Sequence, residues 1–250
     1  MTTPSRDLQG NVAVVVGGSR NMGAAIAEEI ASRGATTVIS YAAHEDDAKA
    51  TVATLEGHGV TAEAVRSDAT EPGATDRLLT DVIERHGHVD IVVHMPGMVL
   101  KKPIADITDA EYDEVVGRNT RTAFWTLRAA SRHLADGGRC VLLSTTITRM
   151  TVGLYGLYAG SKAAVEQLVK AAAQELGGRR ITVNAVAPGP IDDSFFHSAE
   201  TPESVAWVTH ANPFNRLGLP GDVAPVVGFL VSDAAGWVTG QVLPINGGMV

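Results

Sequence analysis

Short apolar runs rich in β-branched residues alternate with longer stretches of helical periodicity along most of the chain. Such alternation is typical of successive βαβ units, in which helices bury both faces of a parallel sheet. We therefore expect an α/β fold with a doubly wound parallel sheet of seven strands. The predicted strands are Val12–Val16, Thr36–Ser40, Ala62–Arg66, Asp90–His94, Arg139–Ser144, Thr182–Ala187 and Gln241–Asn246.

Helix and domain boundaries follow from local signals. The sequence Thr108-Asp109-Ala110-Glu111 is a capping box, which predicts a helix that begins there and runs to about Leu134. No repeat, low-complexity stretch or linker divides the 250 residues, so we expect a single domain over residues 1–250. Residues 190–215 lack clean periodicity and carry Ser, Thr, Pro and aromatic residues, which predicts a mobile lid over a substrate.

Composition narrows the classes of partner. The formal net charge of −8 and the pI near 5.4 argue against binding to nucleic acid or to an anionic membrane surface. Cys140 is the single cysteine, so no intramolecular disulfide can form. No stretch approaches the roughly 18 uninterrupted apolar residues of a membrane span, and the first residues lack the apolar core of a signal peptide. These features predict a cytoplasmic protein.

The first predicted strand leads directly into a glycine-rich turn. Val12–Val16 is followed by Gly17-Gly18-Ser19-Arg20-Asn21-Met22-Gly23, and a helical pattern begins at Ala24. Glycines let the backbone approach a pyrophosphate closely, and a helix N-terminus offers free amides and a partial positive charge. In the first βαβ unit, this turn predicts a dinucleotide site of the Rossmann type.

The end of the second predicted strand indicates which dinucleotide binds. An Asp or Glu there would hold the adenosine ribose and repel a 2′-phosphate, but the strand ends in Ser40-Tyr41-Ala42. Arg20 and the Ser40 hydroxyl could instead hold a phosphate, so NADP(H) is favoured over NAD(H), although Arg20 could also be a plain surface charge. Asp68, after the third strand, is placed either to accept from the adenine amino group or to cap the following helix.

Tyr158 and Lys162 carry the candidate chemistry. Four residues is about one helical turn, so the phenol and the ammonium emerge on the same helix face. A free phenol has a pKa of about 10 and is a poor acid or base near neutrality, but a nearby positive charge lowers that pKa. The spacing therefore predicts a catalytic acid beside its activator, although a chance pair on a helix would look the same.

Together these motifs resemble the short-chain dehydrogenase/reductase family, in its ketoreductase-like branch, from Val12 to Gly248. Asn119 matches the helix asparagine of the family's catalytic tetrad, and Tyr158 and Lys162 match its Tyr-x-x-x-Lys. Residues 184–191 are similar to the segment after the family's sixth strand, where Pro188, Gly189 and Ile191 would border the nicotinamide. Residues 216–218 and 240–248 also fit the family's C-terminal pattern.

The chain departs from the family pattern at several positions. Asn21 replaces the middle glycine of the turn, and asparagine tolerates left-handed backbone better than most residues. His94-Met95-Pro96-Gly97 replaces the usual Asn-Asn-Ala-Gly, which makes His94 either a ligand contact or, as we favour, a structural histidine. The tetrad serine aligns with Thr145, although Ser144 just before it could also serve. Asp193 stands where relatives have a threonine that contacts the carboxamide.

The resemblance implies hydride transfer between nicotinamide C4 and a carbonyl carbon, with Tyr158 as the acid. Lys162 would lower the phenol pKa and bind the nicotinamide ribose, Thr145 would hold the substrate oxygen, and Asn119 would hold a water. No metal is expected. The predicted substrate contacts are Ser144, Thr145, Tyr155 and Tyr158. The predicted cofactor contacts are Gly17, Ser19, Arg20, Asn21, Met22, Gly23, Ser40, Tyr41, Asp68, Ala69, His94, Gly97, Tyr158, Lys162, Pro188, Gly189 and Ile191.

Two other functions remain open at this point. Tyr155 lies seven positions before Lys162 and so fits the Tyr-x6-Lys spacing of the family's enoyl-reductase branch, which reduces a conjugated carbon–carbon double bond. A dinucleotide sensor without turnover is the second alternative. Relatives commonly form tetramers, so a homotetramer is expected. An apolar or aromatic ketone is suggested by Met150, Leu154, Tyr155, Phe195, Phe196 and Trp207.

Overall fold

Seven parallel strands form one sheet in the part of the chain that the computed structural model describes, residues 6–150 and 152–250. The strands are β1 (Val12–Val16), β2 (Thr36–Tyr41), β3 (Ala62–Arg66), β4 (Ile91–His94), β5 (Arg139–Leu143), β6 (Thr182–Pro188) and β7 (Val242–Ile245). Every neighbouring pair is parallel, as predicted. The predicted ends match for β1 and β3 and differ by at most one residue elsewhere, because backbone pairing rather than side-chain pattern decides where a strand stops.

The strand order is β3-β2-β1-β4-β5-β6-β7. The chain moves outward from β1 to β3 and then returns to place β4 on the other side of β1, so the order reverses between β1 and β4. In open parallel sheets, ligands bind in the crevice at the carboxyl ends of the strands where this reversal occurs. The doubly wound Rossmann-type fold is therefore confirmed, and it places the glycine turn after β1 beside the segment after β4.

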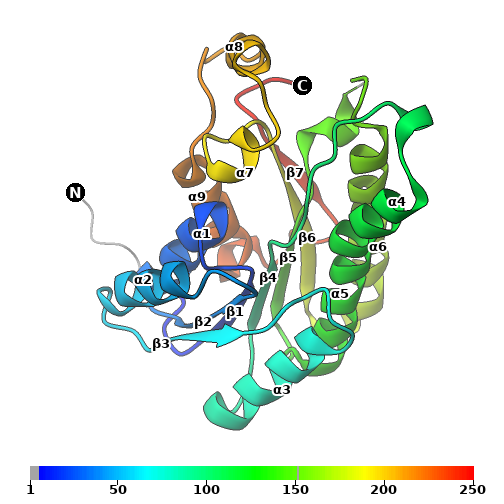
Figure 1. Cartoon of the computed structure of the whole chain (residues 1–250). Helices are drawn as coiled ribbons and strands as arrows, with labels where there is room; N and C mark the ends of the chain where they lie inside the picture. Colours follow the sequence, from blue (N-terminus) through cyan, green and yellow to red (C-terminus); the bar gives the residue numbers. More distant parts are fainter. Residues whose placement is uncertain (1–5, 151) are drawn as a thin grey trace.

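Helices cover both faces of the sheet (Figure 1). They are α1 (Asn21–Ser32), α2 (Glu45–Glu56), α3 (Ala74–His86), α4 (Asp109–Val116), α5 (Thr122–His133), α6 (Gly156–Leu176), α7 (Ser194–His197), α8 (Pro202–His210) and α9 (Pro220–Leu230). The core on one face packs α1, α2 and α9 against the strands, and the core on the other packs α3, α5 and α6. All five residues of β1 are buried, which explains why this strand is an unbroken apolar run.

The long helix predicted after Thr108 is interrupted. Its capping box forms as expected, because Thr108 Oγ1 accepts from the Glu111 amide at 3.2 Å and Glu111 Oε2 accepts from the Thr108 amide at 2.8 Å. A π-helical turn, η2 (Gly117–Arg121), then joins α4 to α5. Single π turns inside α-helices are frequent at functional sites, and this one contains Asn119.

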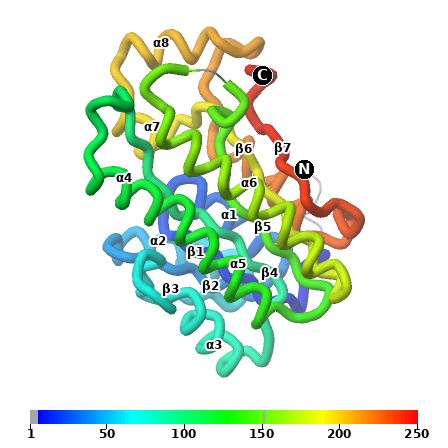
Figure 2. Tube along the Cα trace, turned by 90° about the vertical axis from the view of Figure 1, so that its right-hand side faces the viewer, coloured from blue at the N-terminus to red at the C-terminus, as the bar shows by residue number. Residues whose placement is uncertain are grey.

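Residues 190–215 form more regular structure than the sequence indicated. They contain α7 and α8, which lie above the carboxyl edge of the sheet, near the C-terminus, in Figures 1 and 2. Thr201 caps α8 by accepting from the Ser204 amide at 3.3 Å. The missing periodicity has a simple physical reason, since both helices are too short to bury a continuous stripe.

Candidate active site

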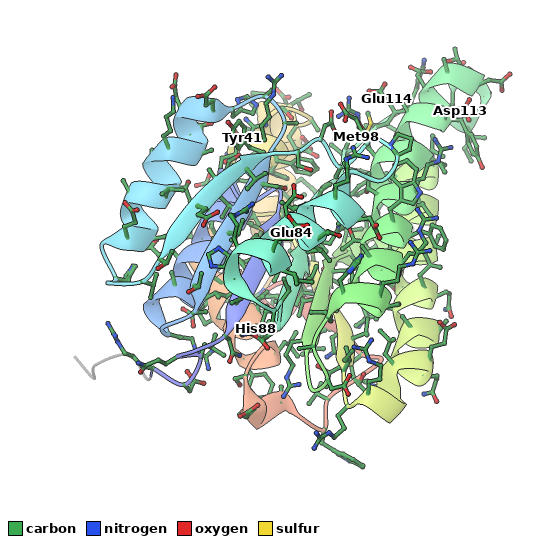
Figure 3. The ribbon with its side chains drawn as sticks, turned by 90° about the horizontal axis from the view of Figure 1, so that it is seen from below. Tyr41, Glu84, His88, Met98, Asp113 and Glu114 are labelled. Carbon is green, nitrogen blue, oxygen red and sulfur yellow. The ribbon has the colours of Figure 1, made fainter. Side chains whose placement is uncertain are left out.

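A cavity of about 330 Å³ opens at the carboxyl edge of the sheet. Its wall combines the glycine turn, the segment after β4, the end of β5, the start of α6, the end of β6 and residues 190–208. Figure 3, seen from below, shows Tyr41 at the end of β2 and Met98 after β4 along one edge, with His88 toward the opposite end of the strands. The predicted site residues in the wall are Gly17, Ser19, Arg20, Asn21, Met22, Gly23, Tyr41, Gly97, Ser144, Thr145, Tyr155, Tyr158, Lys162, Pro188, Gly189 and Ile191.

The glycine turn approaches its neighbours too closely for side chains. A Cβ on Gly18 would lie 2.8 Å from Ile39, and one on Gly23 would overlap the Gly17 carbonyl. Gly17 has φ 77°. Asn21 has φ 53°, so the sequence-based expectation of a left-handed residue at this position is confirmed.

Ser40 supports this turn rather than lining the cavity. Its side chain is buried, its hydroxyl accepts from the Gly17 amide at 3.2 Å, and its carbonyl accepts from the Gly18 amide at 3.1 Å. The strand turns this side chain inward, and the predicted contact between the Ser40 hydroxyl and a phosphate stays a prediction. Arg20 and Tyr41 remain in the cavity wall, and Arg20 is exposed.

Asp68 and Ala69 lie apart from the main cavity. Asp68 Oδ1 accepts from the Thr70 amide at 2.9 Å and from the Thr70 hydroxyl at 2.7 Å. These bonds form a local turn and not a cap of the following helix, because the N-cap of α3 is Gly73 and no side chain caps it. Asp68 lines a second cavity that shares Ala42 with the first, whereas Ala69 is buried in the core. The predicted adenine contacts of these two residues stay predictions.

Thr145 and Ser144 face different partners. Burial raises the pKa of the Tyr158 phenol, and a hydrogen bond with the Thr145 side chain partly offsets that rise. Ser144 Oγ instead donates to Glu166 Oε1 at 2.6 Å, and Thr148 donates to the same oxygen at 2.7 Å. The structure thus brings Thr145, rather than Ser144, next to the phenol. Glu166, on α6, was not singled out from the sequence because its position carries no motif.

Lys162 is buried in the same cavity as Tyr158. Its ammonium donates to the Leu143 carbonyl at 2.9 Å, and burial lowers its pKa to about 8. The predicted lowering of the phenol pKa by this ammonium is not seen in the protein alone, because desolvation of the phenol is the larger effect. A Cβ on Gly97 would lie 3.0 Å from Lys162 Nζ and 3.1 Å from Asn119 Oδ1, so a side chain there would have to displace these two groups.

Asn119 links the segment after β4 to α6 by hydrogen bonds. Its Oδ1 accepts from the Met98 amide at 2.7 Å, and its Nδ2 donates to the Met98 carbonyl and to Ser161 Oγ, each at 2.9 Å. Both amide protons are therefore used within the protein. The predicted contact between Asn119 and a water stays a prediction, and neither side-chain proton is free for it.

His94 is enclosed beneath the site. The Thr122 hydroxyl donates to the Arg118 carbonyl at 2.6 Å, so it can only accept from His94 Nε2, which lies 3.3 Å away. Thr126 Oγ1 then donates to Nδ1 at 2.8 Å. Burial, followed by the charge of Lys162, lowers the pKa of His94 to about 3. This geometry supports the structural alternative, and the side chain does not form part of the cavity wall.

Tyr155 is bound to a carboxylate that the sequence did not point to. Its hydroxyl donates to Glu200 Oε1 at 2.7 Å, while Lys101 Nζ and Ser204 Oγ donate to Oε2 at 2.8 and 2.5 Å. The Glu200 side chain is 5% exposed and lies in the cavity wall with Tyr155. Met150, Phe195, Phe196 and Trp207 also line this end, whereas Leu154 is half exposed and lies outside it.

The residues of this cavity fit a dinucleotide. The first turn of α1 has no side-chain cap, so its amides are available to an anion beside the glycine turn. Asp193 lines the wall next to Ile191, and its buried Oδ2 accepts no hydrogen bond within the described residues, which leaves it ready for a donor on a ligand. Among the same residues no three His, Cys, Asp or Glu side chains gather as a metal site would require.

Comparisons with known proteins agree with this geometry. A family model described as enoyl-(acyl carrier protein) reductase matches residues 16–250. A versicolorin reductase of Emericella nidulans is 38% identical over 256 residues, 96% of each protein. A Burkholderia cenocepacia dehydrogenase solved with bound NADP superposes with a TM-score of 0.94 at 37% identity, covering 98% of this chain and 96% of its own. An angucycline C-6 ketoreductase solved with bound NADP superposes with a TM-score of 0.91 at 32% identity. The match covers 100% of this chain and 99% of the ketoreductase.

The chain therefore belongs to the short-chain dehydrogenase/reductase family. It is an oxidoreductase of the ketoreductase type. No helix among the described residues is both long and apolar enough to cross a membrane.

Proposed function

We propose that this protein interconverts a ketone and a secondary alcohol with NADP(H). The observation that carries the proposal is the placement of Tyr158, Thr145 and Lys162 in one cavity with the glycine turn. A buried phenol with a raised pKa keeps its proton near neutrality, so Tyr158 can donate that proton to an oxygen that becomes negative. Ketoreductase and NADP-bound relatives support the same reaction class.

In this proposal each side chain has a defined task. The Thr145 hydroxyl donates to the carbonyl oxygen and polarises it, and Tyr158 delivers the proton. Lys162, whose pKa of about 8 leaves it charged at neutral pH, binds the ribose next to the nicotinamide. Bound NADPH would supply the hydride. Pro188, Gly189 and Ile191 would border its nicotinamide, and Asp193 Oδ2 would accept from its carboxamide.

Selection of NADP(H) over NAD(H) rests on two features of the wall. Arg20 is exposed in the glycine turn, and no carboxylate follows β2 in Tyr41-Ala42 to repel a 2′-phosphate. NADP-bound structural relatives support this preference. A homotetramer, a cytoplasmic location and a lid role for residues 190–215 remain part of the proposal, on the sequence grounds given above.

The substrate is proposed to be an apolar, aromatic ketone. The substrate end of the cavity carries Met150, Phe196 and Trp207, and an apolar wall favours a ligand that buries apolar surface. The test is a screen at 340 nm of NADPH and NADH with aryl, fused-ring and β-keto ester carbonyls. Oxidation of NADPH by aryl or fused-ring ketones is expected. Cofactor binding without turnover on ketones or activated alkenes would instead favour the dinucleotide sensor.

Enoyl reduction is the second candidate, favoured by the description of the family model and by Tyr155. Burial first, and then the bond to Glu200, raise the pKa of Tyr155, so its proton is held by the carboxylate. A tyrosine bound in this way is a poor donor to a substrate. Carbonyl chemistry through Tyr158 is therefore the better supported of the two reactions.

A further inference from the structure

The two tyrosines of the cavity have opposite hydrogen-bonding character. Their ring centroids lie 6.3 Å apart with planes inclined at 53°, and both rings line the cavity. The Tyr158 phenol lies beside the neutral hydroxyl of Thr145, which partly offsets the rise in the phenol pKa caused by burial. The Tyr155 hydroxyl donates a hydrogen bond to the Glu200 carboxylate at 2.7 Å. A phenol oxygen whose proton is committed can still accept, so Tyr155 offers lone pairs to a ligand and no donor.

The environment of Glu200 keeps this arrangement in place. Lys101 and Ser204 bind its second oxygen, and the Lys101 ammonium also lies 5.2 Å from the centre of the Tyr155 ring. Burial raises the pKa of Glu200, but the bonds from Lys101, Ser204 and Tyr155 more than offset this, and the net shift is downward. The carboxylate therefore stays ionised at neutral pH and continues to accept the hydrogen bond from the Tyr155 hydroxyl.

We propose that Tyr155, with its proton committed to Glu200, is a specificity-determining residue that selects ketones bearing a hydroxyl donor away from the reacting carbonyl. This inference rests on the proposed ketone reduction for its kinetic consequence but not for the binding preference. A substrate in this pocket meets a donor pair, Thr145 and Tyr158, at one end and an acceptor, Tyr155, at the other. A fused-ring hydroxy-ketone carries the complementary acceptor and donor on one rigid frame.

Selection arises because a desolvated Tyr155 oxygen that accepts no hydrogen bond from the ligand costs free energy. If an ether or an unsubstituted ring occupies the site, the Tyr155 oxygen loses water and gains no donor. A hydroxyl restores that bond. One neutral hydrogen bond contributes roughly a factor of ten in affinity. The expected discrimination between a hydroxy ligand and its methyl ether is of this order.

Binding can be measured without turnover by isothermal titration calorimetry. The probes are 1- and 2-naphthol and their methyl ethers, each titrated into the protein with NADP⁺ present. At least one naphthol should bind about tenfold more tightly than its ether. In Tyr155→Phe this ratio should fall to about one, and in Glu200→Gln, a weaker acceptor, it should fall part of the way. NADP⁺ binding by each variant shows that it is folded.

Tyr112→Phe is the matched control, because Tyr112 is exposed on α4, and it should keep the ratio of the unmodified protein. The inference would be overturned if naphthols and their methyl ethers bound equally well. It would also be overturned if the affinity ratio between naphthol and ether persisted in Tyr155→Phe, because the ratio would then reflect only the bulk of the methyl group. A second experiment compares kcat/KM for hydroxy-1-tetralones and methoxy-1-tetralones. The ratio of these two values in each variant should equal the ratio of affinities expected for the naphthols and their ethers. If no ketone is reduced while the naphthol preference and its loss in Tyr155→Phe hold, the proposed reaction fails and the inference about Tyr155 stands.

Discussion

Asn21 and Ser194 exchange hydrogen bonds between the glycine turn and α7. Asn21 Nδ2 donates to Ser194 Oγ at 2.9 Å, and that hydroxyl lies 3.2 Å from Asn21 Oδ1, to which it can donate in return. Asn21 belongs to the glycine turn, whereas Ser194 is the first residue of α7. Side chains from opposite sides of the entrance are thus joined over the place where the pyrophosphate is proposed to bind.

Breaking this contact should speed cofactor release. In Asn21→Gly the backbone keeps its left-handed conformation at no cost, and in Ser194→Ala the partner is lost without a change in the turn. Each variant should raise the NADPH dissociation rate about tenfold, the equivalent of one or two hydrogen bonds, as measured by stopped-flow fluorescence. Because both changes remove the same bonds, the double variant should be no faster than either single one. Additive rates would contradict a direct coupling.

Replacement of the two cavity tyrosines should have different consequences. Tyr158→Phe removes the proposed acid and should lower kcat about 10²- to 10⁴-fold, the usual contribution of general acid catalysis. Tyr155→Phe keeps the acid, so its effect should fall on the discrimination between substrates. Steady-state kinetics with an aryl ketone decides the point. Full turnover in Tyr158→Phe together with loss in Tyr155→Phe would reverse the assignment and favour the enoyl-reductase alternative.

Removal of the Ser144 hydroxyl and removal of the adjacent Thr145 hydroxyl should have different effects. Thr145→Val removes the proposed donor to the carbonyl oxygen and should lower kcat by about 10²- to 10³-fold with little change in NADPH affinity. Ser144→Ala removes one of the two hydroxyl groups that donate to Glu166 Oε1. The decrease in kcat should therefore be smaller than in Thr145→Val, and part of the effect should be a lower stability of the protein. Measuring kcat and thermal unfolding for both variants distinguishes chemistry from support. A larger kcat loss in Ser144→Ala would assign the catalytic hydroxyl to Ser144.

Much of the fold was predictable because the local and global signals agree. The apolar run Val12–Val16 is wholly buried, and the capping box at Thr108 begins α4 where the pattern places it. The π turn at Gly117–Arg121 was missed because five residues are too few to show a period of their own. Helices α7 and α8 were missed because neither is long enough to show a period.

The candidate site was predictable where motif and geometry coincide, as for Tyr158 and Lys162. It was not predictable where a partner distant in sequence decides the role of a side chain. Ser40 and Ser144 lie beside motif residues, but the Ser40 hydroxyl accepts from the Gly17 amide and the Ser144 hydroxyl donates to Glu166. Glu200 has no motif and is brought to Tyr155 only by the path of residues 190–208.

Arg20 should decide between the two cofactors. Arg20→Ala removes the exposed guanidinium of the glycine turn, and a charge-assisted hydrogen bond to a phosphate is worth roughly 1.5–3 kcal/mol. The Kd for NADPH should therefore rise about 10- to 100-fold, whereas the Kd for NADH should change little. Lys170→Ala, which removes one exposed positive charge from α6, is the control for overall charge. Equal weakening of both cofactors would place Arg20 on the pyrophosphate instead.

His94 should make the protein less stable in mild acid. Its folded pKa, about 3, lies below the roughly 6.5 of an unfolded histidine, so only the unfolded chain gains a proton as the pH falls between these values. The buried neutral ring of His94 therefore contributes fully to stability above pH 6.5. Below pH 6.5 this contribution is lost progressively, and the free energy of unfolding falls by about 2 kcal/mol at pH 5. In His94→Asn the fall in unfolding free energy between pH 7.5 and 5.0, measured in urea, should shrink by this amount. His44→Asn, at a half-exposed side chain, should leave the fall unchanged. An undiminished fall in His94→Asn would mean that the buried ring accepts a proton in the folded protein, against the hydrogen bonds that Thr122 and Thr126 make with it.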